Sequence, residues 1–280
     1  MTDKTYMFDL IKRSLEEDLG SGDLTSAATI PLTDTGEGRI FSKQSGIISG
    51  TEITRDIFHA VDRDLKVKID FRDGMSVEPQ EVVVVIEGRI RSILSAERVA
   101  LNFLGHLSGI ATLTARFVEL TRDTSAKIID TRKTTPLLRR LEKEAVFAGG
   151  GTNHRMGLFD MVLIKENHIR AAGGIQEAVR STESYLQETG RKVKIEVETR
   201  NLDEVHEALC CKIQRIMLDN MTIPEIREAV ELINHQVEVE VSGGVNLGNV
   251  REIALCGVDF ISVGAITHSA PAFDFSLLIG

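Results

Sequence analysis

Residues 127–133, KIIDTRK, show the pattern that decides the fold: a short apolar run followed at once by charged residues. The pattern recurs along the second half of the chain, and the predicted strands end at Ile129, Ile164, Val197, Leu218, Val241 and Val263. Helical stretches with start and stop signals lie between these strands. Such βα repeats give either a doubly wound sheet or a barrel, and six strands fall short of a full eight-stranded barrel.

The first part of the chain has a different pattern. Apolar residues at helical spacing predict an opening helix that ends at Gly20, and another helix is expected around residues 53–61. Short strand-like runs separated by glycines predict a small, largely antiparallel α+β domain. These runs are residues 39–41, 65–69 and 82–86.

A long helical pattern joins the two parts of the chain. Ser95 is its predicted N-cap, and apolar residues then recur on one stripe as far as Val118. Gly105 and Gly109 lie inside the pattern and leave open whether it forms one straight helix. The domain boundary is expected inside or near this helix.

Composition excludes several classes of protein. The net charge of −9, from 33 Lys+Arg and 42 Asp+Glu, argues against a general binder of nucleic acid or of anionic membranes. The longest aliphatic run, residues 82–86, is far too short to cross a bilayer, and no signal-peptide pattern is visible. The three cysteines are too few for a disulfide framework and lack metal-binding spacing. A cytoplasmic protein is therefore expected.

The charge is distributed unevenly. Residues 131–170 carry eight positive and four negative side chains, a balance of +4, so the rest of this −9 chain carries −13. A cationic island in an acidic chain predicts a site for an anionic small molecule. Three of its cations follow predicted strands and are poorly explained as surface residues: Arg132, Lys133 and Lys165. The glycine-rich segment 149–155 would deliver two further groups, His154 and Arg155.

Glycines and carboxylates also follow the strands, whose carboxyl ends would meet at one mouth of a barrel. Ser242, Gly243, Gly244 and Gly264 come where barrels commonly hold phosphate on backbone N–H groups, although plain turns would also explain them. Glu198 and Asp219 suit Mg²⁺ held partly by substrate oxygens, although either could be a helix cap or an ion-pair partner. Glu196 has the same strand parity as Glu198, so the pattern does not tell which of them faces the site.

These residues predict an enzyme that acts on a multiply anionic ligand, with Mg²⁺. Two other classes stay open on the residues alone. Lys165 would also suit a Schiff-base lysine on an aldolase-like barrel. A non-catalytic anion-binding module would bind the same ligands without turnover.

Several long motifs resemble those of the quinolinate phosphoribosyltransferases (nicotinate-nucleotide pyrophosphorylases, carboxylating). The motifs are residues 130–136, 149–155, 163–168, 262–264 and 267–269, and the likeness runs nearly end to end. The chain departs from the family pattern at Leu137, where Gly is usual, and at Glu166, where Asp is usual. The first departure puts the local turn after Pro136 in doubt, and the second preserves charge.

The resemblance implies the α/β architecture of type II phosphoribosyltransferases. An N-terminal α/β open sandwich is expected over residues 1–105 and a β/α barrel-like domain of about seven strands over residues 106–269. The tail, residues 270–280, is expected to return to the first domain. The resemblance also implies a homodimer or a hexamer of dimers, in which Arg98 is contributed across the interface.

The implied activity is the Mg²⁺-dependent transfer of phosphoribosyl from phosphoribosyl pyrophosphate to quinolinate with loss of CO₂. The products would be nicotinate mononucleotide and pyrophosphate, in de novo NAD biosynthesis. A relative of the same fold found with molybdate transport genes, with a different substrate, is the nearest alternative, and the complete set of Arg, Lys and His residues favours the transferase.

The resemblance also assigns the site residues. Those implied for quinolinate are Arg98, Arg132, His154, Arg155 and Lys165. Those implied for phosphoribosyl pyrophosphate and Mg²⁺ are Lys133, Glu198, Asp219, Ser242, Gly243, Gly244, Gly264 and His268, and Thr131 is a further expected substrate contact. Lys133, Lys165, Glu198 and Asp219 are the expected catalytic groups, and Glu198 and Asp219 the metal ligands.

Overall fold

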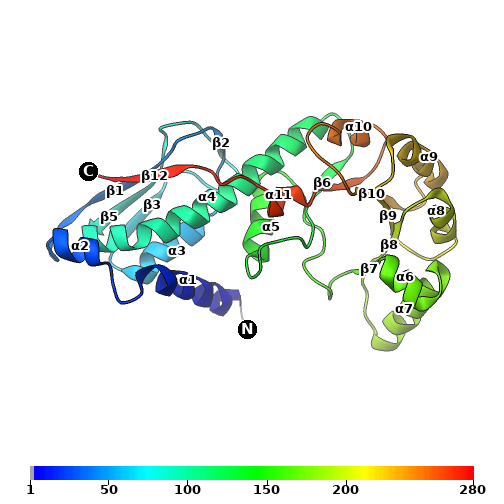
Figure 1. The fold of residues 1–280 in the computed structure, drawn as a ribbon, viewed down its shortest axis with the longest axis horizontal. Coiled ribbons are helices and arrows are strands. Elements are labelled where there is room, and N and C mark those ends of the chain that lie inside the picture. Colours follow the sequence, from blue (N-terminus) through cyan, green and yellow to red (C-terminus); the bar gives the residue numbers. More distant parts are fainter. Residues whose placement is uncertain (1–2) are drawn as a thin grey trace. The chain divides into compact units, whose positions relative to one another are not determined.

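The computed structural model describes residues 3–280 as two compact units (Figure 1). Unit 1 comprises the described chain up to Leu113, together with Thr135–Gly150 and Ala270–Gly280. Unit 2 comprises Thr114–Thr134 and Gly151–Ser269. The chain therefore re-enters unit 1 twice and unit 2 once.

Unit 1 is built on a four-stranded antiparallel sheet with the order β12-β1-β5-β3. Its strands are β1 (Thr35–Ser42), β3 (Lys66–Ile69), β5 (Val82–Arg89) and β12 (Phe275–Ile279), and β2 (Gly46–Ile47) pairs with β4 (Ser76–Val77) separately. The three predicted strands are confirmed, with longer bounds for β1 and β5. The last strand of the chain completes this sheet, because Gly38 of β1 lies opposite Ile279 of β12.

The remaining elements of unit 1 are helices. They are α1 (Asp3–Leu19), α2 (Leu24–Thr29), α3 (Thr51–Val61), α5 (Arg139–Ala148) and the first part of α4 (Ile90–Thr121). The predicted helices ending at Gly20 and around residues 53–61 are confirmed by α1 and α3.

The long helix α4 is continuous, which answers the question left open by its two glycines, whereas the predicted N-cap was wrong. The helix begins at Ile90, directly after β5, so Ser95 is not its N-cap. Ser95 belongs to the second turn of the helix, and its hydroxyl donates to Oδ2 of Asp23 at 3.4 Å. Gly105 and Gly109 do not interrupt it. A Cβ at these positions would lie 2.7 Å from Phe273 O and 2.1 Å from Pro271 O, so the glycines allow the C-terminal tail to pass against the helix.

Unit 2 contains a six-stranded parallel sheet with the order β6-β11-β10-β9-β8-β7, which confirms the predicted βα repeat. The strands are β6 (Lys127–Ile129), β7 (Val162–Ile164), β8 (Ile195–Thr199), β9 (Arg215–Asp219), β10 (Glu238–Ser242) and β11 (Phe260–Ser262). A parallel bridge between Ile129 and Thr152 extends the pairing beyond β6. The predicted end of one strand at Val197 was wrong, because β8 continues through Glu198 to Thr199.

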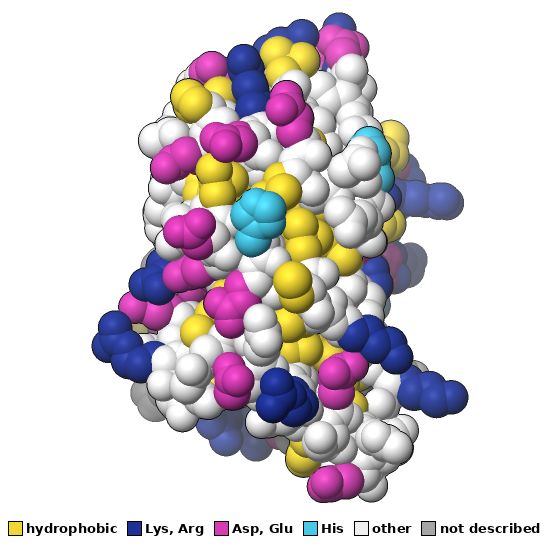
Figure 2. Space-filling view, turned by 90° about the vertical axis from the view of Figure 1, so that its right-hand side faces the viewer, with side chains coloured by type: hydrophobic (Ala, Val, Ile, Leu, Met, Phe, Trp, Pro, Cys, Tyr) yellow, Lys and Arg dark blue, Asp and Glu magenta, His cyan; other side chains and the backbone are white. Residues whose placement is uncertain are grey.

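Helices cover the outer side of this curved row of strands (Figure 1). They are α6 (Glu166–Ala172), α7 (Ile175–Thr189), α8 (Leu202–Leu209), α9 (Ile223–Ile233) and α10 (Val250–Ala254), and the short α11 (Ala265–His268) follows β11. On the face in Figure 2, basic, acidic and hydrophobic side chains are interspersed, and no large patch of one kind of side chain is visible. Of the helices within residues 3–280, none combines the length and apolar character needed to span a bilayer.

Candidate active site

A cavity of about 660 Å³ lies in unit 2, where the carboxyl ends of the parallel strands meet. Eleven predicted site residues line it: Thr131, Arg132, Lys133, His154, Arg155, Lys165, Glu198, Asp219, Ser242, Gly243 and Gly244. Asn220 and Glu240 also line it and were not among the predicted site residues. These residues are distant in the sequence but lie together because parallel strands present their carboxyl ends at the same edge of the sheet.

A larger hollow, of about 810 Å³, lies in unit 1. It is lined by residues of α1 and α3 together with Arg63 and Arg140, and none of the predicted site residues is among them. We therefore take the cavity of unit 2 as the candidate site, because strand ends, glycine turns and several cations converge there.

Three predicted residues do not line the cavity. Gly264 and His268 lie beside it, because a Cβ on Gly264 would be 3.2 Å from both the His268 ring and Cδ of Lys133. The Thr267 hydroxyl donates to the carbonyl oxygen of Lys133 at 2.8 Å, which ties α11 to the loop that carries Lys133. Arg98 is an exposed residue of α4 in unit 1.

Lys165 and two carboxylates form an electrostatic centre in the cavity. Nζ of Lys165 lies 2.8 Å from Oε2 of Glu198, which is nearly buried on β8. Burial raises the pKa of the Asp219 carboxyl, and the negative charge of Glu198 raises it further. Two carboxylates that repel each other in this way favour a bound cation between them and the substrate.

The glycine turn after β10 is specified by close packing as well as by backbone conformation. Gly243 and Gly244 have φ values of +93° and +64°, which favour glycine. A Cβ on Gly243 would lie 2.2 Å from Oδ1 of Asn220, whereas a Cβ on Gly244 would meet nothing within 4 Å. Asn220 in turn donates from Nδ2 to Oδ2 of Asp219 at 2.9 Å. The close packing of Gly243 therefore restricts the side-chain amide of Asn220, which is hydrogen-bonded to Asp219.

Arg155 provides a buried cation. Its Nη1 donates to the carbonyl oxygen of Met161 at 3.0 Å. Burial lowers the pKa of its guanidinium, and the positive charge of Arg132 lowers it further. Like charges gathered in a cavity favour an anion that neutralises both.

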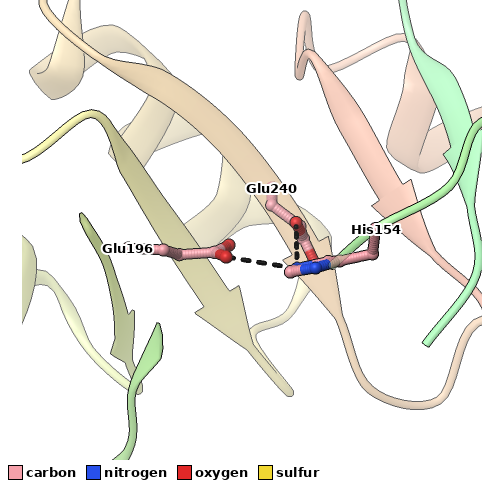
Figure 3. A group of neighbouring side chains, drawn as sticks. All are labelled: His154, Glu196 and Glu240. Carbon is pink, nitrogen blue, oxygen red and sulfur yellow. Dashed lines mark ion pairs between the residues drawn. The ribbon is translucent and has the colours of Figure 1, made fainter. Parts of the chain in front are cut away.

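His154 lines the cavity and lies against two buried glutamates (Figure 3). Its Nε2 is 3.1 Å from Oε2 of Glu196 and 3.4 Å from Oε2 of Glu240. Burial lowers the pKa of His154, but the hydrogen bonds and charges of the two glutamates outweigh burial and raise it to about 9. Burial raises the pKa of Glu196, and the charge of Glu240 raises it further.

The structure answers which glutamate of β8 lines the cavity. Both point inward, as their shared parity requires, but Glu198 lines the cavity while Glu196 is fully buried against His154. Glu240 could have been found by the same reasoning, because it precedes Ser242 by two positions on β10 and so shares its face.

The chain matches two family models over most of its length. Residues 110–278 match the quinolinate phosphoribosyl transferase C-terminal domain, and residues 23–108 match the N-terminal domain. Quinolinate phosphoribosyltransferase [decarboxylating] 1b of Nicotiana tabacum is 44% identical over 96% of this chain and 81% of its own length. Nicotinate-nucleotide pyrophosphorylase [carboxylating], chloroplastic, of Arabidopsis thaliana is 46% identical over 96% of this chain and 82% of its own length.

Solved structures show the same architecture. NadC from Streptococcus pyogenes superimposes with a TM-score of 0.93 at 36% identity, covering 100% of this chain and 99% of its own. The nicotinate-nucleotide pyrophosphorylase from Francisella tularensis gives a TM-score of 0.93 at 36% identity, over 100% of this chain and 98% of its own. The predicted fold class, a small α/β domain followed by a β/α barrel-like domain, is confirmed.

Proposed function

The chain belongs to the quinolinate phosphoribosyltransferase family of decarboxylating pentosyltransferases, and on that premise we propose how its cavity works. It transfers the phosphoribosyl group of phosphoribosyl pyrophosphate to quinolinate in NAD biosynthesis. The products are nicotinate mononucleotide, pyrophosphate and CO₂. The observation that carries the proposal is the convergence of four Lys and Arg side chains with the Glu198 and Asp219 carboxylates in one cavity of an acidic chain.

The cationic side of the cavity receives quinolinate. Arg132, Arg155 and Lys165 face a dianion, and His154 adds a hydrogen-bonding ring. A guanidinium binds a carboxylate through two parallel hydrogen bonds, which fixes orientation as well as affinity. Holding both carboxylates in this way aims the pyridine nitrogen at the sugar carbon that it attacks.

The opposite side receives phosphoribosyl pyrophosphate. Lys133 and the backbone N–H groups of the Ser242–Gly244 turn suit phosphate oxygens. A bond forms between the pyridine nitrogen and C1 of the ribose while the bond from C1 to the pyrophosphate oxygen breaks. Positive charge develops on the sugar, where Glu198 and Asp219 stabilise it, and negative charge develops on the leaving group, where Lys133 stabilises it.

Decarboxylation follows from the first step. Once the nitrogen is alkylated, the ring accepts the electron pair of the adjacent carbon–carboxylate bond, CO₂ leaves, and a proton takes its place on the ring carbon. The cavity's role here is to hold the substrate in place, and no residue is required as a covalent nucleophile.

Mg²⁺ suits this cavity. Glu198 and Asp219 offer the hard oxygen ligands that the ion prefers. Burial raises the pKa of Asp219 and the charge of Glu198 raises it further, and a nearby cation would oppose both effects. We place the ion at these two carboxylates, with substrate oxygens completing its coordination. When bound, it supplies charge neutralisation for the departing pyrophosphate.

An inter-subunit role for Arg98 and a homodimer, or a hexamer of dimers, are further parts of the proposal. Arg98 is exposed on α4 and is not among the residues that line the cavity. If a neighbouring subunit supplies Arg98, inactive Arg98→Ala and Lys165→Ala chains should regain activity when mixed, because some mixed sites are intact. Mixtures that never recover activity would remove Arg98 from the site. A cytoplasmic location is likewise proposed.

The function is tested by mixing the protein with quinolinate, phosphoribosyl pyrophosphate and Mg²⁺ and following nicotinate mononucleotide. Product should appear with Mg²⁺ and disappear when EDTA is added. Absence of product would favour the molybdate-associated relative, with its different substrate. Trapping of a carbonyl substrate on Lys165 by borohydride would instead identify a Schiff-base enzyme.

A further inference from the structure

Three buried side chains from separate segments meet in unit 2 (Figure 3), and two of them, His154 and Glu240, line the cavity. His154 comes from the loop after α5, Glu196 from β8 and Glu240 from β10. The His154 side chain is 6% exposed, and both glutamates are 0% exposed. Within residues 3–280, both carboxylate oxygens of Glu196 and Oε1 of Glu240 lack a hydrogen-bond donor, so their contacts with His154 are ion pairs.

Stability does not account for this cluster. Barrel interiors are usually filled by branched apolar residues, and buried ion pairs are often no more stable than apolar groups of the same volume. A buried acceptor that lacks a donor is a further cost. Two ionisable glutamates at this position therefore point to a role in the site, and His154 is the cavity-lining group that both contact.

Arg215 fixes one of the glutamates firmly. Its Nη1 donates to Oε2 of Glu240 at 2.9 Å, while its Nε and Nη2 donate to Oε2 of Glu238 at 3.2 and 3.1 Å. The guanidinium also lies over the Phe260 ring, 3.9 Å from its centre. An arginine held from β10 and β11 leaves Oε2 of Glu240 little freedom to move.

The His154 ring is held from its other side as well. Its Nδ1 accepts the Arg155 backbone N–H at 2.6 Å, and its own backbone N–H donates to Oδ1 of Asp130 at 2.9 Å. The two glutamates favour a doubly protonated ring, whereas the Arg155 N–H favours a single proton on Nε2. In both states Nε2 carries the proton that faces the glutamates.

This protonation argues against a metal ion in the cluster. The three side chains have ligand atoms within 4.8 Å of one another, as metal ligands would. However, a histidine coordinates through an unprotonated nitrogen, and here Nδ1 is occupied by a backbone donor while Nε2 carries the proton. The nearby Arg215 guanidinium adds positive charge that a metal ion would meet.

We propose that Glu240, anchored by Arg215, is a positioning residue that acts through His154: it holds the ring and its Nε2 proton in the orientation that quinolinate binding requires. Glu196 contacts the same nitrogen of His154, and we refer to Glu196 and Glu240 together as the clamp. The inference rests on the proposed function, since it assumes that His154 contacts quinolinate. It adds residues that act on the acceptor side of the reaction without touching phosphoribosyl pyrophosphate.

A double-mutant cycle tests this role. Glu240→Gln should raise the KM for quinolinate about tenfold to a hundredfold, and the KM for phosphoribosyl pyrophosphate less than about twofold. In a His154→Gln background, Glu240→Gln should add less than about twofold. Glu238→Gln is the matched control, because Glu238 bonds the same arginine from the same strand without contacting His154, and it should leave both KM values unchanged.

Two kinetic results would overturn the proposal: an equal effect of Glu240→Gln with and without His154, or equal increases in both KM values. If Glu240→Gln fails to fold, Glu196→Gln serves in its place, because it leaves the Arg215–Glu240 pair intact and should show the same dependence on His154.

A spectroscopic measurement separates this proposal from the proposed function. With ¹⁵N-labelled histidine, the wild-type protein should show a hydrogen-bonded Nε2 proton for His154 that shifts in Glu240→Gln and not in Glu238→Gln. An unchanged His154 signal in Glu240→Gln would refute the clamp. If the wild type does not turn over quinolinate at all, the proposed function has failed, whereas the clamp is still decided by these spectra.

Discussion

Replacing Gly243 by alanine should damage both the stability of the protein and one half of its site. Two effects combine at this position. The φ of +93° costs a non-glycine residue about 1–2 kcal/mol. The new Cβ would also lie 2.2 Å from Oδ1 and 3.0 Å from the backbone N of Asn220, and overpacking of this kind typically costs about 1–3 kcal/mol. The expected loss in the free energy of unfolding is thus about 2–5 kcal/mol.

The functional effect follows from the displaced amide. Asn220 holds Oδ2 of Asp219 at 2.9 Å, and losing a hydrogen bond to a charged group costs roughly 1.5–3 kcal/mol. The KM for phosphoribosyl pyrophosphate should therefore rise about tenfold or more, while the KM for quinolinate changes little.

Gly244→Ala is the matched control. Its φ of +64° is also left-handed, but a Cβ there would meet nothing within 4 Å. Only the backbone cost of about 1–2 kcal/mol is expected, with little change in either KM. The assay is denaturant unfolding of the three proteins together with steady-state kinetics for both substrates. Equal destabilisation by the two substitutions, or an unchanged KM for phosphoribosyl pyrophosphate in Gly243→Ala, would refute this reasoning.

Three further predictions concern single side chains. Lys165→Ala should lower kcat/KM for quinolinate about tenfold to a hundredfold, because a charged partner of the dianion is lost; unchanged kinetics would remove Lys165 from the site. Leu137→Gly should raise the free energy of unfolding by about 0.5–1 kcal/mol, because Leu137 has φ +66° and an exposed side chain; a lower melting temperature would contradict this. Asp62→Asn should cost about 1–3 kcal/mol at neutral pH, because hydrogen bonds from Arg89 hold the pKa of the buried Asp62 carboxyl well below its usual range. Since that pKa is lowered by folding, the stabilisation is present above about pH 4 and is lost as the pH falls further, so the two unfolding curves should converge in acid; a constant difference would contradict the linkage.

The regular part of the fold could be predicted because each strand is a short apolar run between turn signals. The strand-end residues then followed from one geometric rule, since parallel strands present their carboxyl ends at the same edge. The end of β8 was misjudged because a charged residue, Glu198, was interpreted as leaving the strand. In the structure Glu198 still pairs with Met217 of β9, since the interior near the cavity accommodates a carboxylate.

Other features depend on contacts between distant parts of the chain. Gly105 and Gly109 were interpreted as possible breaks in α4, but their reason is the tail backbone passing beside the helix. Nε2 of His106, also on α4, lies 2.8 Å from Oε1 of the buried Glu142. Residue spacing along the chain carries no information about such pairings.

The buried cluster at His154 illustrates the same limit. Parity on β10 places Glu240 on the inward face, but no pattern indicates that it reaches His154 or that Arg215 of β9 anchors it. These contacts arise from neighbouring strands and a loop that only the folded chain brings together.

The most direct test of the proposed reaction compares quinolinate and nicotinate as acceptors in the presence of phosphoribosyl pyrophosphate and Mg²⁺. Quinolinate labelled in the carboxylate next to the ring nitrogen allows the released CO₂ and pyrophosphate to be counted together. Transfer to quinolinate should release one labelled CO₂ for each pyrophosphate and yield nicotinate mononucleotide, and nicotinate should be a poor acceptor. Pyrophosphate release without CO₂, or efficient transfer to nicotinate in place of quinolinate, would contradict the proposal.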